Sequence, residues 1–221
     1  MSSVSALKRW VRIQNPKFAF LQRYFGNKPF QLLDIGTGNS SASKTISLFP
    51  NCNYYGLDLS REYNNTPEDF ALMKEFYEID LTKLEFSQLP DNFFDAILIV
   101  HVIEHLHNGD EVLKAMLPKL KKGGLMYVEY PGKRSTKLPS MRGTLNYYDD
   151  SSHVRIYSLT ELSKLFIDNA AQIVSLGTRR SKFYLVMTPV RMLGRWVRGK
   201  AVTGNVFWDL LGFAEYVVVR K

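Results

Sequence analysis

The chain has 221 residues with a formal net charge of +8, and 45% of its residues are hydrophobic. These values suit one globular domain with an apolar core and exclude a disordered or fibrous chain. No apolar run reaches the ~18 residues needed to cross a bilayer. The lone Cys52 excludes an internal disulfide and a multi-cysteine zinc site. Since the N-terminal sequence has no secretory signal pattern, we expect a cytoplasmic protein.

Short apolar runs alternate with helical patterns along the chain. Strands are expected at residues 30–35, 53–59, 76–80, 94–100, 125–131, 172–178 and 215–221. Helices are expected within residues 1–28, at 40–49, from Pro67, at 109–121 and from Ser158. Because helices separate most strands, the pattern predicts an α/β fold: a doubly wound, seven-stranded and mostly parallel sheet with helices on both faces. We expect residues 1–221 to form a single domain.

Three local signals set the expected helix ends. Thr66 can cap the helix that follows it. The sequence Lys121-Lys122-Gly123-Gly124 combines cations with glycines, which predicts the end of the 109–121 helix. Ser158 and Glu161 have the spacing of a capping box.

Acidic residues and glycines gather at the expected carboxyl ends of the first three strands, where ligands bind in an open α/β sheet. The first strand runs into Asp34-Ile35-Gly36-Thr37-Gly38, whose glycines let the backbone turn tightly and approach a ligand closely. The second ends in Asp58, about twenty residues further on, where a carboxylate can accept both hydroxyls of a ribose. The third ends in Asp80, where an acid and a backbone N–H can address an adenine edge.

The segments DIGTGN, LDLS, EIDL, FDAILIVHVIEHL and LKKGGLMYVEYP resemble, in order and spacing, the successive motifs of class I S-adenosylmethionine-dependent methyltransferases. The resemblance covers about residues 30–132. It implies S-adenosylmethionine as the cofactor and S-adenosylhomocysteine as the product. It also implies cofactor contacts from Asp34, Gly36 and Gly38 near the amino-acid end, from Asp58 and Leu59 at the ribose and adenine, from Asp80 and Leu81 at the adenine, and from His101 beneath the methionine portion.

The glycine turn departs from two patterns. A nicotinamide dehydrogenase needs a third glycine where this chain has Ser41, which argues against that class. In methyltransferases a third glycine is also frequent, and Ser40 stands there instead. We expect this exchange to be tolerated if the next helix starts at that point, because Asn39 and Ser40 both suit a helix N-terminus.

The stretch His101-Val102-Ile103-Glu104-His105 also matches an inverted zinc-protease signature, H-x-x-E-H. A zinc protease needs both histidines on one face of a helix, whereas His101 directly follows an apolar run and should end a strand. The stretch further resembles the E-V-L-E-H segment of ubiquinone-pathway O-methyltransferases, where two glutamates and a histidine can hold magnesium. His101 replaces the first glutamate, which leaves only Glu104 and His105 at matching positions, and magnesium prefers oxygen ligands. We therefore assign no metal, and a metal held at Glu104 and His105 is the alternative.

The acceptor side is expected in residues 146–153. Their sequence, NYYDDSSH, resembles the N-F/Y-x-D-D-x-T/S-H pattern of methyltransferases associated with bacterial surface-polysaccharide synthesis. Methyl transfer to a hydroxyl requires alignment of the acceptor and usually removal of a proton. We therefore assign His153 and His105 as catalytic residues, with His153 as general base or acceptor-orienting group. A loop ordered by its own side chains is the alternative for His153.

An unusual insert at residues 184–213 precedes the last expected strand. Arg191, Arg195 and Arg198 recur at helical spacing, beside apolar residues. Such a basic amphipathic element can lie on an anionic membrane or recruit a phosphorylated acceptor. A small lid or an oligomer contact is the alternative.

We therefore expect an S-adenosylmethionine-dependent methyltransferase that O-methylates a sugar, a nucleotide-sugar or another small polar acceptor, in polysaccharide biosynthesis. An RNA methyltransferase is one alternative, favoured by the net positive charge. Against nucleic acid as partner, the N/D-P-P-Y type of motif and an appended RNA-binding module are absent from the sequence. A non-catalytic cofactor-binding scaffold is the other alternative. The sequence does not define an oligomeric state.

Overall fold

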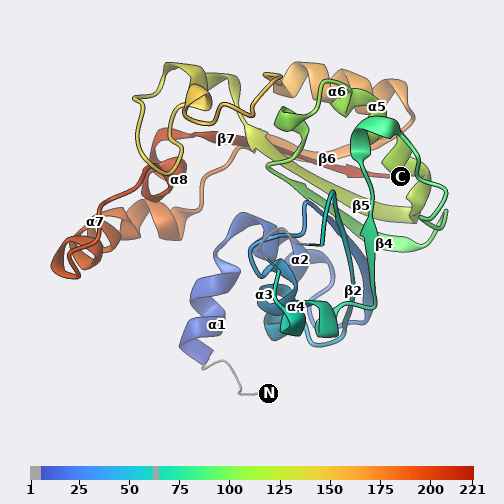
Figure 1. Ribbon diagram of the computed structural model, residues 1–221, viewed down its shortest axis with the longest axis horizontal. Helices are drawn as coiled ribbons and strands as arrows, with labels where there is room; N and C mark the ends of the chain where they lie inside the picture. The colour runs from blue at the N-terminus through green and yellow to red at the C-terminus, as the bar shows by residue number, and fades with distance from the viewer. Residues whose placement is uncertain (1–5, 62–64) are drawn as a thin grey trace.

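The structure, a computed structural model, describes residues 6–61 and 65–221 and is built around one seven-stranded sheet (Figure 1). The strand order is β3-β2-β1-β4-β5-β7-β6. Neighbours from β3 to β5 are parallel, while β7 runs antiparallel between β5 and β6. The predicted seven-stranded, mostly parallel sheet is confirmed. The strands are β1 (Phe30–Ile35), β2 (Cys52–Asp58), β3 (Glu75–Glu78), β4 (Phe94–Val100), β5 (Leu120–Pro131), β6 (Gln172–Thr178) and β7 (Ala214–Arg220).

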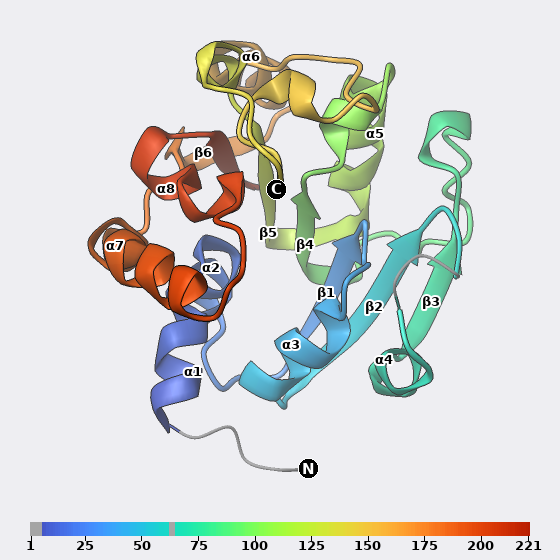
Figure 2. The ribbon, with the colours of Figure 1, turned by 60° about the vertical axis from the view of Figure 1, so that its left-hand side comes forward.

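Helices cover both faces of the sheet, as Figures 1 and 2 show. The described helices are α1 (Ala6–Ile13), α2 (Pro16–Tyr24), α3 (Ser41–Leu48), α4 (Pro67–Leu72), α5 (Gly109–Met116), α6 (Leu159–Asp168), α7 (Lys182–Val197) and α8 (Trp208–Leu211). The first two account for the helical segment expected at 1–28, of which residues 1–5 lie outside the described part. Thr66 caps α4 in a full capping box with Asp69, as its position predicted.

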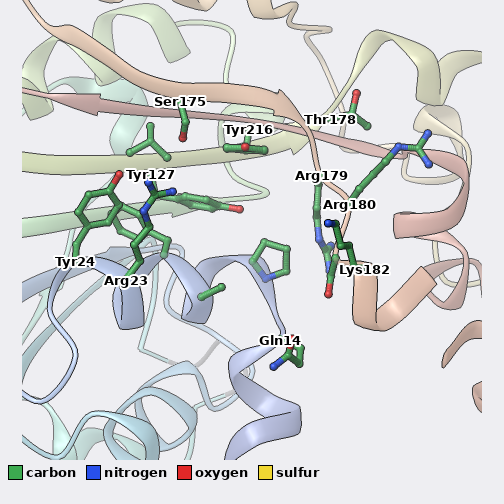
Figure 3. A pocket seen from close by; sticks show the side chains of 15 residues that line it. Gln14, Arg23, Tyr24, Tyr127, Ser175, Thr178, Arg179, Arg180, Lys182 and Tyr216 are labelled. Atoms are coloured by element: carbon green, nitrogen blue, oxygen red, sulfur yellow. The ribbon is translucent and has the colours of Figure 1, made fainter. Parts of the chain in front are cut away.

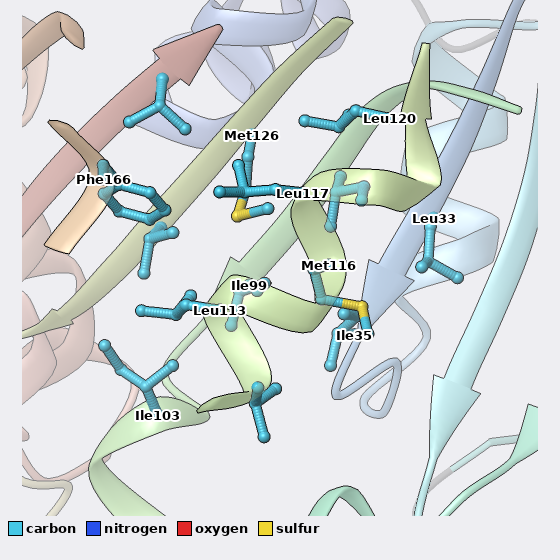
Figure 4. Close-up of a cluster of buried hydrophobic side chains, with 14 of the residues drawn as sticks. Leu33, Ile35, Ile99, Ile103, Leu113, Met116, Leu117, Leu120, Met126 and Phe166 are labelled. Carbon is cyan, nitrogen blue, oxygen red and sulfur yellow. The ribbon is translucent and has the colours of Figure 1, made fainter. Parts of the chain in front are cut away.

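Alternate residues of the central strands feed two separate layers of the core. Leu33 and Ile35 of β1 point to the layer that includes α5 and α6 (Figure 4). Leu32 between them points to the opposite layer, formed with α2 and α3. This alternation is the two-residue period of a strand, and burial on both faces explains why apolar residues predominate in β1 and β4.

The chain order places a topological switch point beside β1. After β1 the chain moves outward through β2 to β3, then returns to β4 on the other side of β1. The connections that leave the carboxyl ends of β1 and β4 therefore diverge, and ligands of open α/β sheets bind at such a divergence.

The predicted end of the helix expected at residues 109–121 is wrong. α5 ends at Met116, and a 3-10 turn with Pro118 follows it. Since proline lacks a backbone N–H, it cannot continue the helical hydrogen-bond ladder. Residues 121–124, expected to close the helix, instead lie in β5, whose first residue Leu120 pairs with Phe94.

The insert between β6 and β7 contains α7 and α8. α7 extends away from the sheet (Figure 1), and among its side chains only Thr188 is buried. Arg191 and Arg195, expected to present one basic face, donate to the backbone carbonyls of Val206 and Ala201 and so brace the insert. Within residues 6–61 and 65–221, no helix combines the length and apolarity that a bilayer crossing demands.

Candidate functional site

A cavity of about 720 Å³ opens at the carboxyl ends of β1, β2 and β4. It brings together residues from the turns after these strands and from the segment that follows β3. His105 and Ser152 line it as well, whereas the other predicted catalytic residue, His153, is not among the lining residues. The lining contains every residue expected to bind a cofactor: Asp34, Gly36, Gly38, Asp58, Leu59, Asp80, Leu81 and His101.

The turn after β1 requires glycine at its first position. Gly36 has φ +76°, and a Cβ there would stand 2.4 Å from Cγ2 of Val102. Asn39 and Ser40 also adopt left-handed backbone conformations, with φ of +54° and +57°. Ser40 is the N-cap residue of α3, which begins at Ser41, so the helix starts where the exchange required, although the Ser40 side chain makes no capping hydrogen bond. Clustered unusual conformations of this kind are typical of functional sites.

Asp34 lies beneath this turn in a buried hydrogen-bond network. Its Oδ2 accepts hydrogen bonds from the hydroxyls of Ser41 and Tyr54, each at 2.6 Å. Lys17 of α2 donates from Nζ to Ser41 Oγ at 2.9 Å. Burial and the Asp34 charge raise the pKa of Tyr54, so its phenol stays protonated and donates. The carboxylate is thus fixed in one orientation at the cavity floor.

The two other acids of the cavity, Asp58 and Asp80, accept hydrogen bonds from residues that are close to them in sequence. Asp58 accepts the backbone N–H of Leu59 at 2.8 Å, and partial burial raises its pKa. A half-buried carboxylate is stabilised by a ligand that supplies hydroxyl donors. Asp80 accepts from the side chain and backbone of Thr82, at 2.6 and 3.0 Å, and these hydrogen bonds lower its pKa.

His101 ends β4 with its ring between two buried carboxylates. Nδ1 lies 3.2 Å from Oε1 of Glu104, and Nε2 lies 3.2 Å from Oε1 of Glu129. Burial alone would lower the pKa of His101, but the two carboxylates outweigh it and raise the pKa to about 9. The imidazole is therefore cationic at neutral pH. Its backbone has φ +56°, and its N–H donates to the Glu129 carbonyl at 2.8 Å.

The Glu129 side chain continues into a buried charge network that sequence reasoning missed. Arg179 lies 3.3 Å from Glu129 through Nη1 and 3.3 Å from Asp209 through Nη2. Although burial opposes ionisation, Arg179, His101 and Tyr127 lower the pKa of Glu129 to about 2. An acid inside the apolar run LMYVEYP was the available signal, because a buried charge needs a partner. Arg179 lies in the connection between β6 and α7, and Asp209 lies in α8. Both are distant from Glu129 in sequence, and the order of strands in the sheet brings them close to it.

α8 packs against the His101 side of this charge network. Trp208 packs against the His101 ring, with centroids 4.9 Å apart, and donates from Nε1 to the Thr144 carbonyl. Asp209 accepts the backbone N–H of Ser181 at the start of α7. The insert is therefore attached directly to the side chains around His101.

His105 and His153 come together although they are distant in sequence. Their ring centroids are 4.8 Å apart. The Glu104 carbonyl accepts the backbone N–H groups of Val154 and Arg155, which holds the 150–155 loop against the 103–105 turn. The His105 ring is partly exposed in the cavity, whereas the His153 side chain is only 4% exposed and lies behind it.

A second cavity, of about 380 Å³, lies between α2, the β6–β7 edge and the start of α7 (Figure 3). Its lining includes the exposed cations Arg23, Arg180 and Lys182 and the buried Arg179, together with tyrosines. No acidic residue stands among its lining residues in the described chain. An anionic group is the ligand that such a lining favours.

A family model and several known proteins match this chain. The family model described as a methyltransferase domain matches residues 9–176. The ubiquinone/menaquinone biosynthesis C-methyltransferase UbiE of Pseudomonas entomophila (strain L48) is 30% identical over 118 residues, 50% of this chain and 45% of that protein. The chain therefore matches somewhat less than half of this relative's length.

Solved structures share the fold at low sequence identity. A SAM-dependent methyltransferase from Archaeoglobus fulgidus has a TM-score of 0.57 and 16% identity, covering 96% of this chain and 94% of that one. Phosphoethanolamine N-methyltransferase 2 of Haemonchus contortus, in complex with S-adenosyl-L-methionine, has a TM-score of 0.64 and 16% identity, covering 100% and 58%. The Rossmann-like methyltransferase fold expected from the sequence is confirmed.

Proposed function

Because this chain belongs to the methyltransferase domain family, we propose that it transfers the methyl group of S-adenosylmethionine to a hydroxyl oxygen of a small polar acceptor. S-adenosylmethionine is the cofactor of this class. The observation that carries the proposal is the convergence of all the predicted cofactor-binding residues on one cavity that His105 also lines.

The cofactor is proposed to extend along the cavity from α2 to the segment after β3. Asp58 accepts the ribose hydroxyls, and Asp80 with Leu81 addresses the adenine. Gly36 and Gly38 leave room for the amino-acid end, near the Asp34 network. His101 lies by the methionine portion. The surroundings of the sulfonium stay net negative, since the three carboxylates of Glu104, Glu129 and Asp209 outnumber the two cations, His101 and Arg179.

Transfer is an in-line displacement at the methyl carbon. The acceptor hydroxyl gives up its proton, its oxygen forms a bond to the methyl carbon, and the carbon–sulfur bond breaks. The electron pair of that bond stays on sulfur, so the sulfonium becomes the neutral thioether of S-adenosylhomocysteine. We propose that His105 and His153 activate the hydroxyl, because they join the cofactor cavity to the 146–153 loop.

A sugar or nucleotide-sugar from surface-polysaccharide synthesis is the acceptor we propose, in the cytoplasm. The support is the NYYDDSSH segment, whose Asp149 accepts backbone N–H groups of Met141, Leu145 and Asn146 and so shapes the loop at the acceptor side. Hydroxyl-rich acceptors suit a cavity edge formed by serine and histidine side chains.

A transfer assay tests this proposal. Protein is incubated with cofactor labelled in the methyl group and with separate panels of nucleotide-sugars, polysaccharide precursors and RNA. The proposal predicts label in one of the sugar-containing panels and, at cofactor concentrations below saturation, much less label with Asp58→Ala. Labelled RNA would support the nucleic-acid alternative instead. Cofactor binding without transfer to any panel would favour the scaffold alternative.

A peripheral contact with an anionic membrane is a second proposal, carried by α7. Exposed apolar side chains form a stripe along α7 at helical spacing, and each of them is more than half exposed. The stripe consists of Val186, Val190, Leu193 and Val197, with Trp196 beside it. Exposed cations follow at Arg198 and Lys200. An apolar stripe with flanking cations is the arrangement that binds the surface of an anionic bilayer.

A further inference from the structure

We propose that Glu104, His105 and His153 form a binding site for one divalent transition-metal ion of the zinc type. Each of these residues offers a ligand atom, and the three atoms lie within 4.8 Å of one another. The set combines two imidazoles with one carboxylate, and it includes a histidine from a loop 48 positions beyond His105, as the residue numbers show.

Glu104 carries a carboxylate oxygen without a partner. The side chain is 1% exposed, Oε1 contacts His101, and Oε2 has no hydrogen-bond partner among the described residues. A buried carboxylate oxygen left in that state costs free energy on the order of several kcal/mol unless a cation or donor meets it. A bound cation supplies that partner.

The hydrogen bonds of both imidazoles leave Nε2 free to bind a metal. His153 donates from Nδ1 to the Tyr147 carbonyl at 2.6 Å. His105 Nδ1 lies 3.0 Å from Ser152 Oγ, and that hydroxyl donates to Asp150, so the histidine is the donor of the pair. Metal-bound histidines typically donate their other N–H to a carbonyl or carboxylate in this way, which fixes the tautomer.

Carboxylates around the three proposed ligands also favour a cation. Oδ2 of Asp150 lies 4.0 Å from Nε2 of His153, too far for a hydrogen bond but close enough to attract a cation. With Glu104, this places two carboxylates around the two imidazoles. Imidazole nitrogens favour zinc and similar transition ions, whereas magnesium and calcium prefer oxygen ligands.

Three protein ligands leave at least one coordination position open, which is the pattern of catalytic rather than structural sites. Because His105 and Ser152 line the proposed cofactor cavity, an ion bound here would lie at its edge. This inference rests on the proposed function in one respect: the ion would bind the acceptor hydroxyl and lower its pKa, the proton would pass to solvent water, and the oxygen would reach the methyl carbon as an alkoxide. In that case His105 and His153 activate the hydroxyl by holding the ion. Metal uptake itself needs neither acceptor nor cofactor.

Cobalt titration of chelator-treated, full-length protein tests the site. Co²⁺ is added to wild-type protein and to the Glu104→Gln, His105→Ala and His153→Ala variants, and visible absorption and calorimetry are recorded. The proposal predicts one equivalent bound by the wild type, displaced by Zn²⁺, and affinity lowered roughly 100-fold or more in each variant. Ser152→Ala, which removes the support of one ligand, should lower affinity about 10-fold. His107→Ala, an exposed histidine outside the cluster, is the matched control and should bind like the wild type.

Two further measurements keep the outcome interpretable. Circular dichroism checks the fold of each variant. If substitution of the buried Glu104 unfolds the protein, the change at the partly exposed His105, His105→Ala, still tests the metal site. Binding of S-adenosylhomocysteine is measured separately and should be unchanged in His153→Ala. Wild-type protein that binds S-adenosylhomocysteine but takes up no Co²⁺ at millimolar concentration would overturn the metal site and leave the proposed function standing. Equal Co²⁺ affinity in wild type, His105→Ala and His153→Ala would overturn it as well.

Discussion

Glu104 lies against His101, with its Oε1 3.2 Å from Nδ1 of the imidazole. The backbone carbonyl of the same glutamate accepts the N–H groups of Val154 and Arg155. One residue therefore connects the end of β4, at the cofactor cavity, with the loop that carries His153. This connection joins the proposed cofactor side and the proposed acceptor side into one site.

The tight turn after β1 should tolerate no side chain at Gly36. Gly36→Ala places a Cβ 2.4 Å from Val102 in a left-handed conformation. We expect it to lower the free energy of unfolding by about 2–4 kcal/mol, a backbone cost plus an overpacking cost. Gly123→Ala is the matched control, since its φ is +79° with no atom within 4 Å of the new Cβ, and it should cost only about 1–2 kcal/mol. Chemical denaturation measures both, and equal losses would contradict the close approach of Val102.

Asp58 should contribute strongly to cofactor affinity. In Asp58→Ala the ribose hydroxyls lose a charged acceptor, whose hydrogen bonds are worth about 1.5–3 kcal/mol, so binding should weaken roughly 10- to 150-fold. Equilibrium dialysis with labelled S-adenosylmethionine measures the ratio. Asp168→Ala, which removes an exposed acid on α6, should bind like the wild type. An unchanged affinity in Asp58→Ala would remove this carboxylate from the cofactor site.

His101 should make stability depend on pH in the alkaline range. Its pKa is about 9 in the folded protein, above the ~6.5 of an unfolded chain, because Glu104 and Glu129 outweigh burial. The folded state therefore binds the extra proton, so this stabilisation is complete below about pH 6.5 and is lost as pH rises through 9. Arg179 and Asp209 complete the charged surroundings. Although burial opposes its ionisation, the carboxylates of Glu129 and Asp209 raise the pKa of Arg179, so the guanidinium stays charged across that range.

Denaturation of wild type and His101→Asn at pH 6.5 and 9.5 measures this contribution. Asparagine is chosen because it tolerates the left-handed backbone of this position. We expect the wild type to lose more stability over this interval than the variant. The same pH dependence in both proteins would show that His101 is neutral in the folded state.

The sequence predicted best what depends on local pattern. β1 and β4 agree with their apolar runs at both ends, since strands buried on both faces consist almost wholly of apolar residues. The helix expected at residues 109–121, which is α5, was predicted to end too late. Residues 121–124 resemble a helix terminus, whereas the turn that contains Pro118 already follows the end of α5. The contact of Glu129 with Arg179 could not be foreseen, because it depends on β7 lying between β5 and β6. The pairing of His105 with His153 likewise depends on how a loop folds back onto the turn after β4.

The apolar stripe of α7 should bind anionic vesicles. Replacement of Val190, Leu193 and Val197 by serine should weaken sedimentation with phosphatidylglycerol vesicles at least ~10-fold, because burying even one such side chain is worth about 1.5–3 kcal/mol. Ile167→Ser, at an exposed apolar residue of α6, is the control and should sediment like the wild type. Absence of wild-type sedimentation at low salt would end the membrane proposal.

Calorimetric titration of the wild-type protein with S-adenosylhomocysteine tests the central claim most directly. If the cavity at the carboxyl ends of β1, β2 and β4 is the cofactor site, one equivalent should bind with micromolar affinity. Folded protein that gives no binding heat at millimolar product, across two temperatures, would contradict the assignment of this cavity to S-adenosylmethionine.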